Sequence, residues 1–159
     1  MAHNVRGRTT GRKPPAQLAA LILAVIFLLI GVLGFIPGIT TDYYDLSFAG
    51  HHSEAKLLGL FQVSVLHNLV HLVFGLVGLV LARTLAGARV FLIGGGAVYL
   101  VLWIYGLAVV NKGSANWIPV NNADNWLHLL LGIGMLALGL LLSRRAGTGG
   151  RLDNPIDRP

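Results

Sequence analysis

The chain has no cysteine and few charged residues. None of its 159 residues carries a thiol, which excludes disulfides, thiolate metal ligands and cysteine nucleophiles. Only 11% of the residues are charged, whereas soluble domains average about 25%. Hydrophobic residues make up 55% and the mean hydropathy is +0.72. This composition is typical of a membrane protein.

Familiar catalytic motifs are also missing. The glycines at 94–96 lack the Lys-Ser/Thr that a phosphate-binding loop requires, so close helix packing explains them better. The sequence shows no Ser-His-Asp arrangement, no paired carboxylates within its apolar stretches and no dinucleotide fingerprint. We therefore do not expect an enzyme.

Four uncharged apolar stretches dominate the chain: Ala16–Ile36, Leu57–Ala82, Val90–Val110 and Trp126–Leu142. A helix needs about 20 residues to cross the hydrocarbon of a bilayer. The sequence therefore predicts an all-α membrane protein, a bundle of four transmembrane helices forming one domain over residues 16–142. The polar segments 1–15 and 143–159 have no apolar periodicity and are expected to be disordered cytoplasmic tails.

Basic residues are distributed unevenly around these stretches. Ten of the twelve Lys and Arg residues precede the first stretch, separate the second from the third, or follow the fourth. Only Lys56 and Lys112 belong to the two remaining loops. By the positive-inside rule, both termini are cytoplasmic in a multi-pass protein of the bacterial inner membrane. The same placement argues against nucleic acid as a partner. We expect the lipid bilayer, with a homo-oligomer or a larger membrane complex as a further prediction.

The second and fourth stretches each carry polar residues followed by glycines. The two sets are His67, Asn68 and His71 with Gly75 and Gly78, and Asp124, Asn125 and His128 with Gly132 and Gly139. Polar groups at this depth are costly to expose to lipid, and glycine lets a neighbouring helix approach closely. Both polar faces are therefore predicted to point inward and to meet as a buried His/Asn/Asp cluster between the second and fourth helices.

The two sets also resemble one another. Residues 67–72 align with residues 124–129 at a constant offset of 57 residues, and Gly75 then aligns with Gly132. Both helices would cross the membrane in the same direction, so the pattern predicts a parallel duplication of a helical hairpin. No comparable match between the first and third stretches is evident.

The predicted cluster has three interpretations. The histidines could simply hydrogen-bond between helices and fix their packing. His67 and His71, four residues apart, could share a divalent metal with His128 and Asp124, or two histidines could ligate a haem for electron transfer or a stress response. A proton or solute path in a small oligomeric transporter or channel is the third. We favour packing in a structural or accessory membrane component and expect no cofactor.

One aromatic group in the third stretch is a weaker candidate. Tyr99, Trp103 and Gly106 could stack on a quinone or porphyrin, although aromatic residues at helical spacing more often belong to the core.

Two segments carry a family resemblance. Residues 59–83 and 117–134 resemble a family of small bacterial membrane proteins known as domain of unknown function 4383. The most specific parts are residues 66–71 and 119–128, and the resemblance extends over residues 18–142. It implies a four-span membrane protein and assigns no activity, partner or cofactor.

Overall fold

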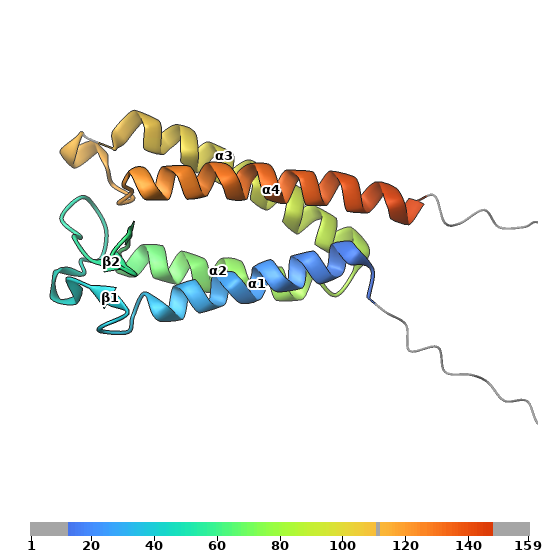
Figure 1. Ribbon diagram of the computed structural model, residues 1–159, viewed down its shortest axis with the longest axis horizontal. Helices are drawn as coiled ribbons and strands as arrows, with labels where there is room; N and C mark the ends of the chain where they lie inside the picture. Colours follow the sequence, from blue (N-terminus) through green and yellow to red (C-terminus); the bar gives the residue numbers. More distant parts are fainter. Residues whose placement is uncertain (1–12, 111, 148–159) are drawn as a thin grey trace, which may run out of the picture.

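A computed structural model describes residues 13–110 and 112–147, with side chains up to residue 142. Its described chain folds into four α-helices (Figure 1): α1 Pro15–Leu33, α2 Val65–Leu81, α3 Leu85–Val109 and α4 Asn122–Gly147. This confirms the helical fold. Three of the helices, α1, α3 and α4, are long and apolar enough to cross a membrane. The predicted tails lie largely outside the described residues.

Helix α2 is shorter than its apolar stretch. It begins at Val65 because the Ser64 hydroxyl caps its first turn, accepting a hydrogen bond of 3.1 Å from the backbone N–H of His67. The predicted start at Leu57 is therefore wrong, and α2 has 17 residues. Apolar character alone did not reveal the cap.

Helices α3 and α4 extend beyond their predicted bounds. The Thr84 hydroxyl caps α3 by accepting from the N–H of Gly87 at 3.0 Å, so α3 begins before Val90 and the predicted loop from Arg83 to Arg89 is mostly helix. Glycines 94–96 consequently lie inside α3 rather than at its start. Helix α4 begins before Trp126, and its backbone continues past Leu142 to Gly147.

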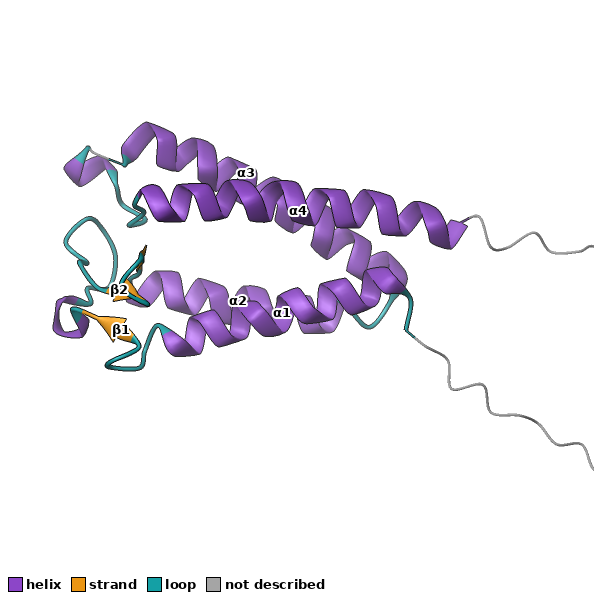
Figure 2. Cartoon of the chain, viewed as in Figure 1, coloured by secondary structure: helices purple, strands orange, loops and turns teal. Residues whose placement is uncertain are grey.

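A small sheet closes one end of the bundle (Figure 2). Strands β1 Thr40–Thr41, β2 Lys56–Leu57 and β3 Phe61–Gln62 pair antiparallel in the order β1-β2-β3. Short 3₁₀ helices, η1 Tyr43–Asp45 and η2 Gly113–Ala115, lie at the same end. We call this the sheet end. The turn between α2 and α3 and both ends of the described chain lie at the opposite end (Figure 1), which we call the terminal end.

The helices pack as two antiparallel pairs, α1 with α2 and α3 with α4 (Figure 1). Small residues line the contacts: Ala16, Ala20 and Ala24 of α1 are fully buried. Large aliphatic side chains point outward instead, on all four helices. On α2 they are Leu69, Val70, Val73, Leu76, Val77 and Val80. Small residues inside and large apolar residues outside are typical of helices surrounded by lipid.

Aromatic rings join the two pairs. Phe27 of α1 stacks on Tyr99 of α3 with ring centroids 5.5 Å apart and planes 10° apart. Phe27 also meets Phe74 of α2 edge-on at 5.0 Å, and Phe74 lies 5.1 Å from Phe91 of α3. These rings fill the middle of the bundle and hold the pairs in register.

Candidate functional site

The polar residues of α2 and α4 begin at matching helix caps near the sheet end. The side-chain oxygen of Ser64 accepts from the N–H of His67, and that of Asn121 accepts from the N–H of Asp124 at 3.0 Å. His71 and His128 therefore follow their caps by the same number of residues. Equal spacing places both imidazoles at a similar distance from the sheet end.

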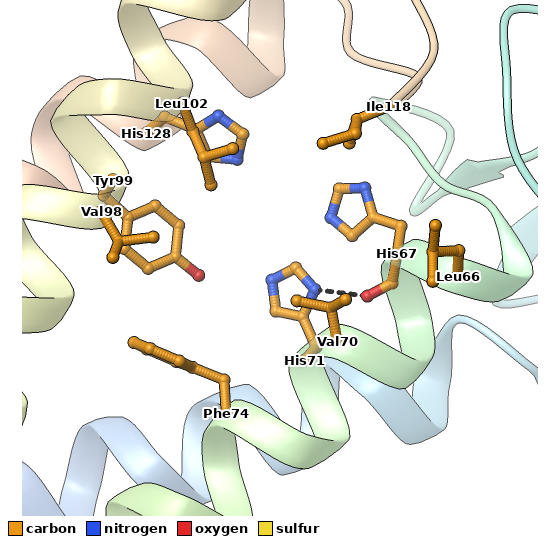
Figure 3. Close-up of a pocket in the computed structure, with 10 residues that line it drawn as sticks. All are labelled: Leu66, His67, Val70, His71, Phe74, Val98, Tyr99, Leu102, Ile118 and His128. Atoms are coloured by element: carbon orange, nitrogen blue, oxygen red, sulfur yellow. Dashed lines mark hydrogen bonds between the residues drawn. The ribbon is translucent and has the colours of Figure 1, made fainter.

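A cavity of about 110 Å³ lies between the two helix pairs. Figure 3 shows the side chains of His67, His71, Tyr99 and His128 pointing into it. The rest of its wall is apolar, formed by Leu66, Val70, Phe74, Val98, Leu102 and Ile118. The site is thus an apolar hollow with four polar ring groups on its surface.

A second cavity of about 230 Å³ lies next to the first. The same four polar rings line it, and Asp124 adds a carboxylate. The remaining lining residues are Ile30, Leu57, Leu58, Phe61, Val63, Leu127 and Leu131. Four of the six predicted cluster residues, His67, His71, Asp124 and His128, therefore line one space.

The two α2 imidazoles lie face to face. Their ring centroids are 4.6 Å apart and their planes differ by 6°. The Nδ1 of His71 lies 3.0 Å from the carbonyl oxygen of His67, and a carbonyl only accepts, so this Nδ1 carries the hydrogen. In the neutral ring, the Nε2 of His71 is then an acceptor.

This stacking bears on metal binding. A metal ion sits in the plane of each imidazole that ligates it, and two parallel stacked planes do not meet. With their rings stacked in this way, the nitrogens of His67 and His71 do not point toward a common ion. Among the described residues, no three His, Asp or Glu side chains are arranged to hold a metal. The prediction that no cofactor is bound stays a prediction.

Asp124 connects α4 to the sheet. Its carboxylate accepts from the backbone N–H of Gln62 in β3 at 3.0 Å and from that of Asn121 at 2.9 Å. The side chain of Asn121 also donates to the carbonyl of Leu60 at 2.7 Å. Asp124 is 2% exposed, and these bonds supply its buried carboxyl group with donors. Asp124 therefore ties the loop before α4 to strand β3.

The two asparagines lie elsewhere. Asn68 of α2 packs against Gly34, which follows α1, and Asn125 of α4 packs against Gly106 of α3. Each glycine leaves the space that the amide occupies, because a side chain there would overlap it. The six residues therefore do not form one continuous cluster between α2 and α4. Each asparagine instead lies within its own helix pair.

The four predicted packing glycines contact neighbouring helices. A Cβ on Gly75 would stand 2.8 Å from the carbonyl oxygen of Ala24 in α1, and one on Gly132 would stand 2.6 Å from Leu100 in α3. Added Cβ atoms would also meet Phe91 from Gly78 and Ile93 from Gly139, at 2.6 and 2.7 Å. The glycine faces of α2 and α4 therefore turn toward α1 and α3, not toward one another.

Sequence reasoning missed some residues of the site. Phe27 stacks on Tyr99. Ile118 reaches the cavity from the loop between α3 and α4 (Figure 3). Neither residue carries a chemical signal in the sequence. The sequence made Tyr99 a weaker candidate for stacking on a quinone or porphyrin but did not indicate its place beside His128, whose ring centroid is 5.3 Å away.

Residues 17–141 match the family described as Domain of unknown function (DUF4383). The chain belongs to this family. The DUF4383 match includes the two polar segments and nearly all of the four helices. No curated protein and no solved structure matches the chain. The functional argument therefore rests on the geometry of the site.

Proposed function

We propose that this DUF4383 protein is a structural or accessory component of the bacterial cytoplasmic membrane, spanning it four times with both termini on the cytoplasmic side. The observation that carries the proposal is the inverted packing of the described helices. Small residues and polar groups lie between the helices, and large aliphatic side chains cover the outside. An outer surface of this kind is suited to contact with lipid.

The four-span count depends on α2. Its 17 residues rise about 26 Å at 1.5 Å per residue, close to the thickness of the hydrocarbon core. It pairs with α1, which is long enough to span, and runs in the opposite direction (Figure 1). Leaving α2 outside the membrane would expose its apolar outer face to water. This pairing supports α2 as a fourth span.

The orientation follows from charge. The terminal end carries Arg83 and Arg89, and the chain segments that continue from it hold eight further Lys and Arg residues. The sheet end carries Lys56 and Lys112 together with four of the six acidic residues. Cytoplasmic loops are enriched in Lys and Arg, which supports a cytoplasmic terminal end.

A duplicated hairpin is supported by matching contacts in the two pairs. Gly75 lies against Leu28 as Gly132 lies against Leu100, and these residues keep constant offsets of 57 and 72 positions. With the same offsets, Asn68 lies against Gly34 as Asn125 lies against Gly106. Phe27 beside His71 likewise corresponds to Tyr99 beside His128. A parallel repeat of α1–α2 as α3–α4 accounts for all three matches.

In this proposal the polar side chains chiefly fix packing. Asp124 holds two backbone N–H groups, His71 bonds to its own helix, and each asparagine fills the space beside a glycine. Contacts of this kind specify which faces meet in a medium that gives little hydrophobic driving force. Association with further copies or with a larger complex remains a proposal.

An optical spectrum and elemental analysis of the purified full chain test the structural role. We expect no Soret band and metal far below one ion per chain. Near-stoichiometric haem or metal, lost when His67 or His71 is changed to Gln, would contradict the proposal. Retention of either cofactor after a matched change at the loop residue His51 would show that the loss is specific.

A further inference from the structure

The cavity among His67, His71, Tyr99 and His128 has more hydrogen-bonding capacity than the protein uses. The Nδ1 atoms of His67 and His128 are buried and have no hydrogen-bond partner among the described residues. His128 is 4% exposed. Buried polar atoms are almost always paired, with protein, water or a ligand. Amide atoms of Asn68 and Asn125, away from the cavity, are also unpaired among the described residues, so a polar occupant is indicated by the groups that face the cavity.

The available groups would suit an uncharged molecule with oxygen atoms. The Nε2 of neutral His71 is an acceptor, and Figure 3 shows it facing the side of the cavity where the Tyr99 hydroxyl lies. That hydroxyl can donate to a carbonyl or accept from a hydroxyl. The remaining walls are apolar, so an ion would lose its hydration without a countercharge. Carbonyl and hydroxyl oxygens fit this combination.

The floor of the cavity is aromatic. Phe74 and Tyr99 line it, and both rings contact Phe27 behind them, at 5.0 and 5.5 Å. Aromatic walls favour a planar ring, which can stack or meet their edges. Together with the adjoining cavity of about 230 Å³, this space of about 110 Å³ has room for a single six-membered ring with its oxygens.

An apolar groove of about 330 Å³ continues from the cavity along α2. It shares Leu66, Val70 and Phe74 with the cavity and proceeds to Val77. From Leu66 to Val77 the helix rises about 16 Å. Val70 is 55% exposed and Val73 60%, so the groove opens sideways to the lipid rather than to water. A hydrocarbon chain attached to the ring would lie here.

We propose that this space binds a lipid-soluble quinone or its quinol, the ring among the three histidines and Tyr99 and the apolar chain along α2. The site goes beyond the structural role, which needs no ligand. It makes the protein a membrane component that senses or holds a quinone-class lipid. Its hydrogen-bonding capacity, aromatic floor and lipid-facing groove each match one part of such a molecule.

The test is binding of 2-decyl-1,4-benzoquinone to the full chain in lipid nanodiscs, with empty nanodiscs measuring simple partition into lipid. We expect saturable binding of one quinone per chain. Val98→Trp fills the cavity from its lipid side and should weaken affinity by at least about tenfold. Val101→Trp is the matched control on the same helix, since Val101 faces outward away from the cavity, and affinity should stay within about twofold.

Tyr99→Phe separates a quinone site from a general lipid groove. Removing the hydroxyl should weaken quinone binding by about fivefold, the size of one net hydrogen bond, and leave the fold intact. Lauric acid and dioleoylglycerol should not displace the quinone. Absence of saturable binding, no effect of both Val98→Trp and Tyr99→Phe, or equal displacement by lauric acid would overturn the proposal. Each of these results leaves the four-span structural role standing, because that role is tested by topology and stability.

Discussion

At the scale of single residues, Asp124 makes the contacts most easily tested. Asp124→Ala leaves the N–H groups of Gln62 and Asn121 without their acceptor, which should cost about 1–3 kcal/mol of unfolding free energy. Asp124→Asn keeps an oxygen that accepts both bonds and should cost clearly less. Thermal unfolding in detergent measures both. Equal loss for the two variants would show that the carboxylate does something other than accept these bonds.

The histidines should contribute modestly to stability. His67→Gln and His71→Gln each retain a polar side chain of similar reach, so we expect losses below about 1 kcal/mol each. The bond from His71 goes to the backbone oxygen of His67 and survives a change of the His67 side chain, so the stacked rings are the one coupling between the two side chains and the departure from additivity should be small. The double variant measured beside both single variants checks this. A loss far below the sum would indicate a shared ligand.

The sequence predicted the chemistry of individual residues better than their partners. Polarity within an apolar stretch was enough to expect Asn68 and His128 to avoid lipid, and both are buried. Polarity could not indicate that Asn68 lies against Gly34, because a small residue on any neighbouring helix could have left room for the amide. Choosing the partner requires the crossing of α1 and α2, which depends on many contacts together.

At the scale of helices, the glycine contacts give a graded prediction. Gly75→Leu and Gly132→Leu should push α2 from α1 and α4 from α3, at a cost of about 1–3 kcal/mol each. Gly94→Leu and Gly134→Leu are matched controls on α3 and α4, because no described atom of a neighbouring helix lies within 4 Å of their added Cβ positions. Thermal midpoints of the four variants in one detergent provide the comparison. Controls that fall as far as the test variants would remove the packing argument.

Helix existence was predictable, whereas helix ends and the sheet were not. Apolar length identified all four helices, but the side-chain caps of Ser64 and Thr84 set where α2 and α3 begin. The strands escaped prediction because each has two residues, too few to show an alternating pattern. Gly87 lies in the first turn of α3, where an added Cβ would meet the carbonyl oxygen of Leu81, so a larger residue there would disturb the start of the helix.

At the scale of the whole molecule, the pairing of helices differs from what the polar faces indicated. Two polar faces were expected to meet because each needed partners. In the structure the asparagines and glycines of each face pack mainly within their own antiparallel pair, and the three histidines and Asp124 line a space that the two pairs share with Tyr99. The short return between α3 and α4 keeps that pair together, whereas α1 and α2 are joined by the long segment 34–64 and are held by the close contacts of their small residues.

The central claim is that four helices cross the membrane with the terminal end in the cytoplasm. The absence of cysteine allows single cysteines to report position without background. Tyr44→Cys and Ser114→Cys place exposed thiols at the sheet end, and Ala86→Cys places one at the terminal end. A membrane-impermeant maleimide applied to intact bacterial spheroplasts then reports the side of each.

We predict labelling of Tyr44→Cys and Ser114→Cys in intact spheroplasts and labelling of Ala86→Cys only after the membrane is permeabilised. Labelling of Tyr44→Cys and Ala86→Cys from the same side would show that α2 does not cross. Reversal of all three would contradict the cytoplasmic placement of both termini.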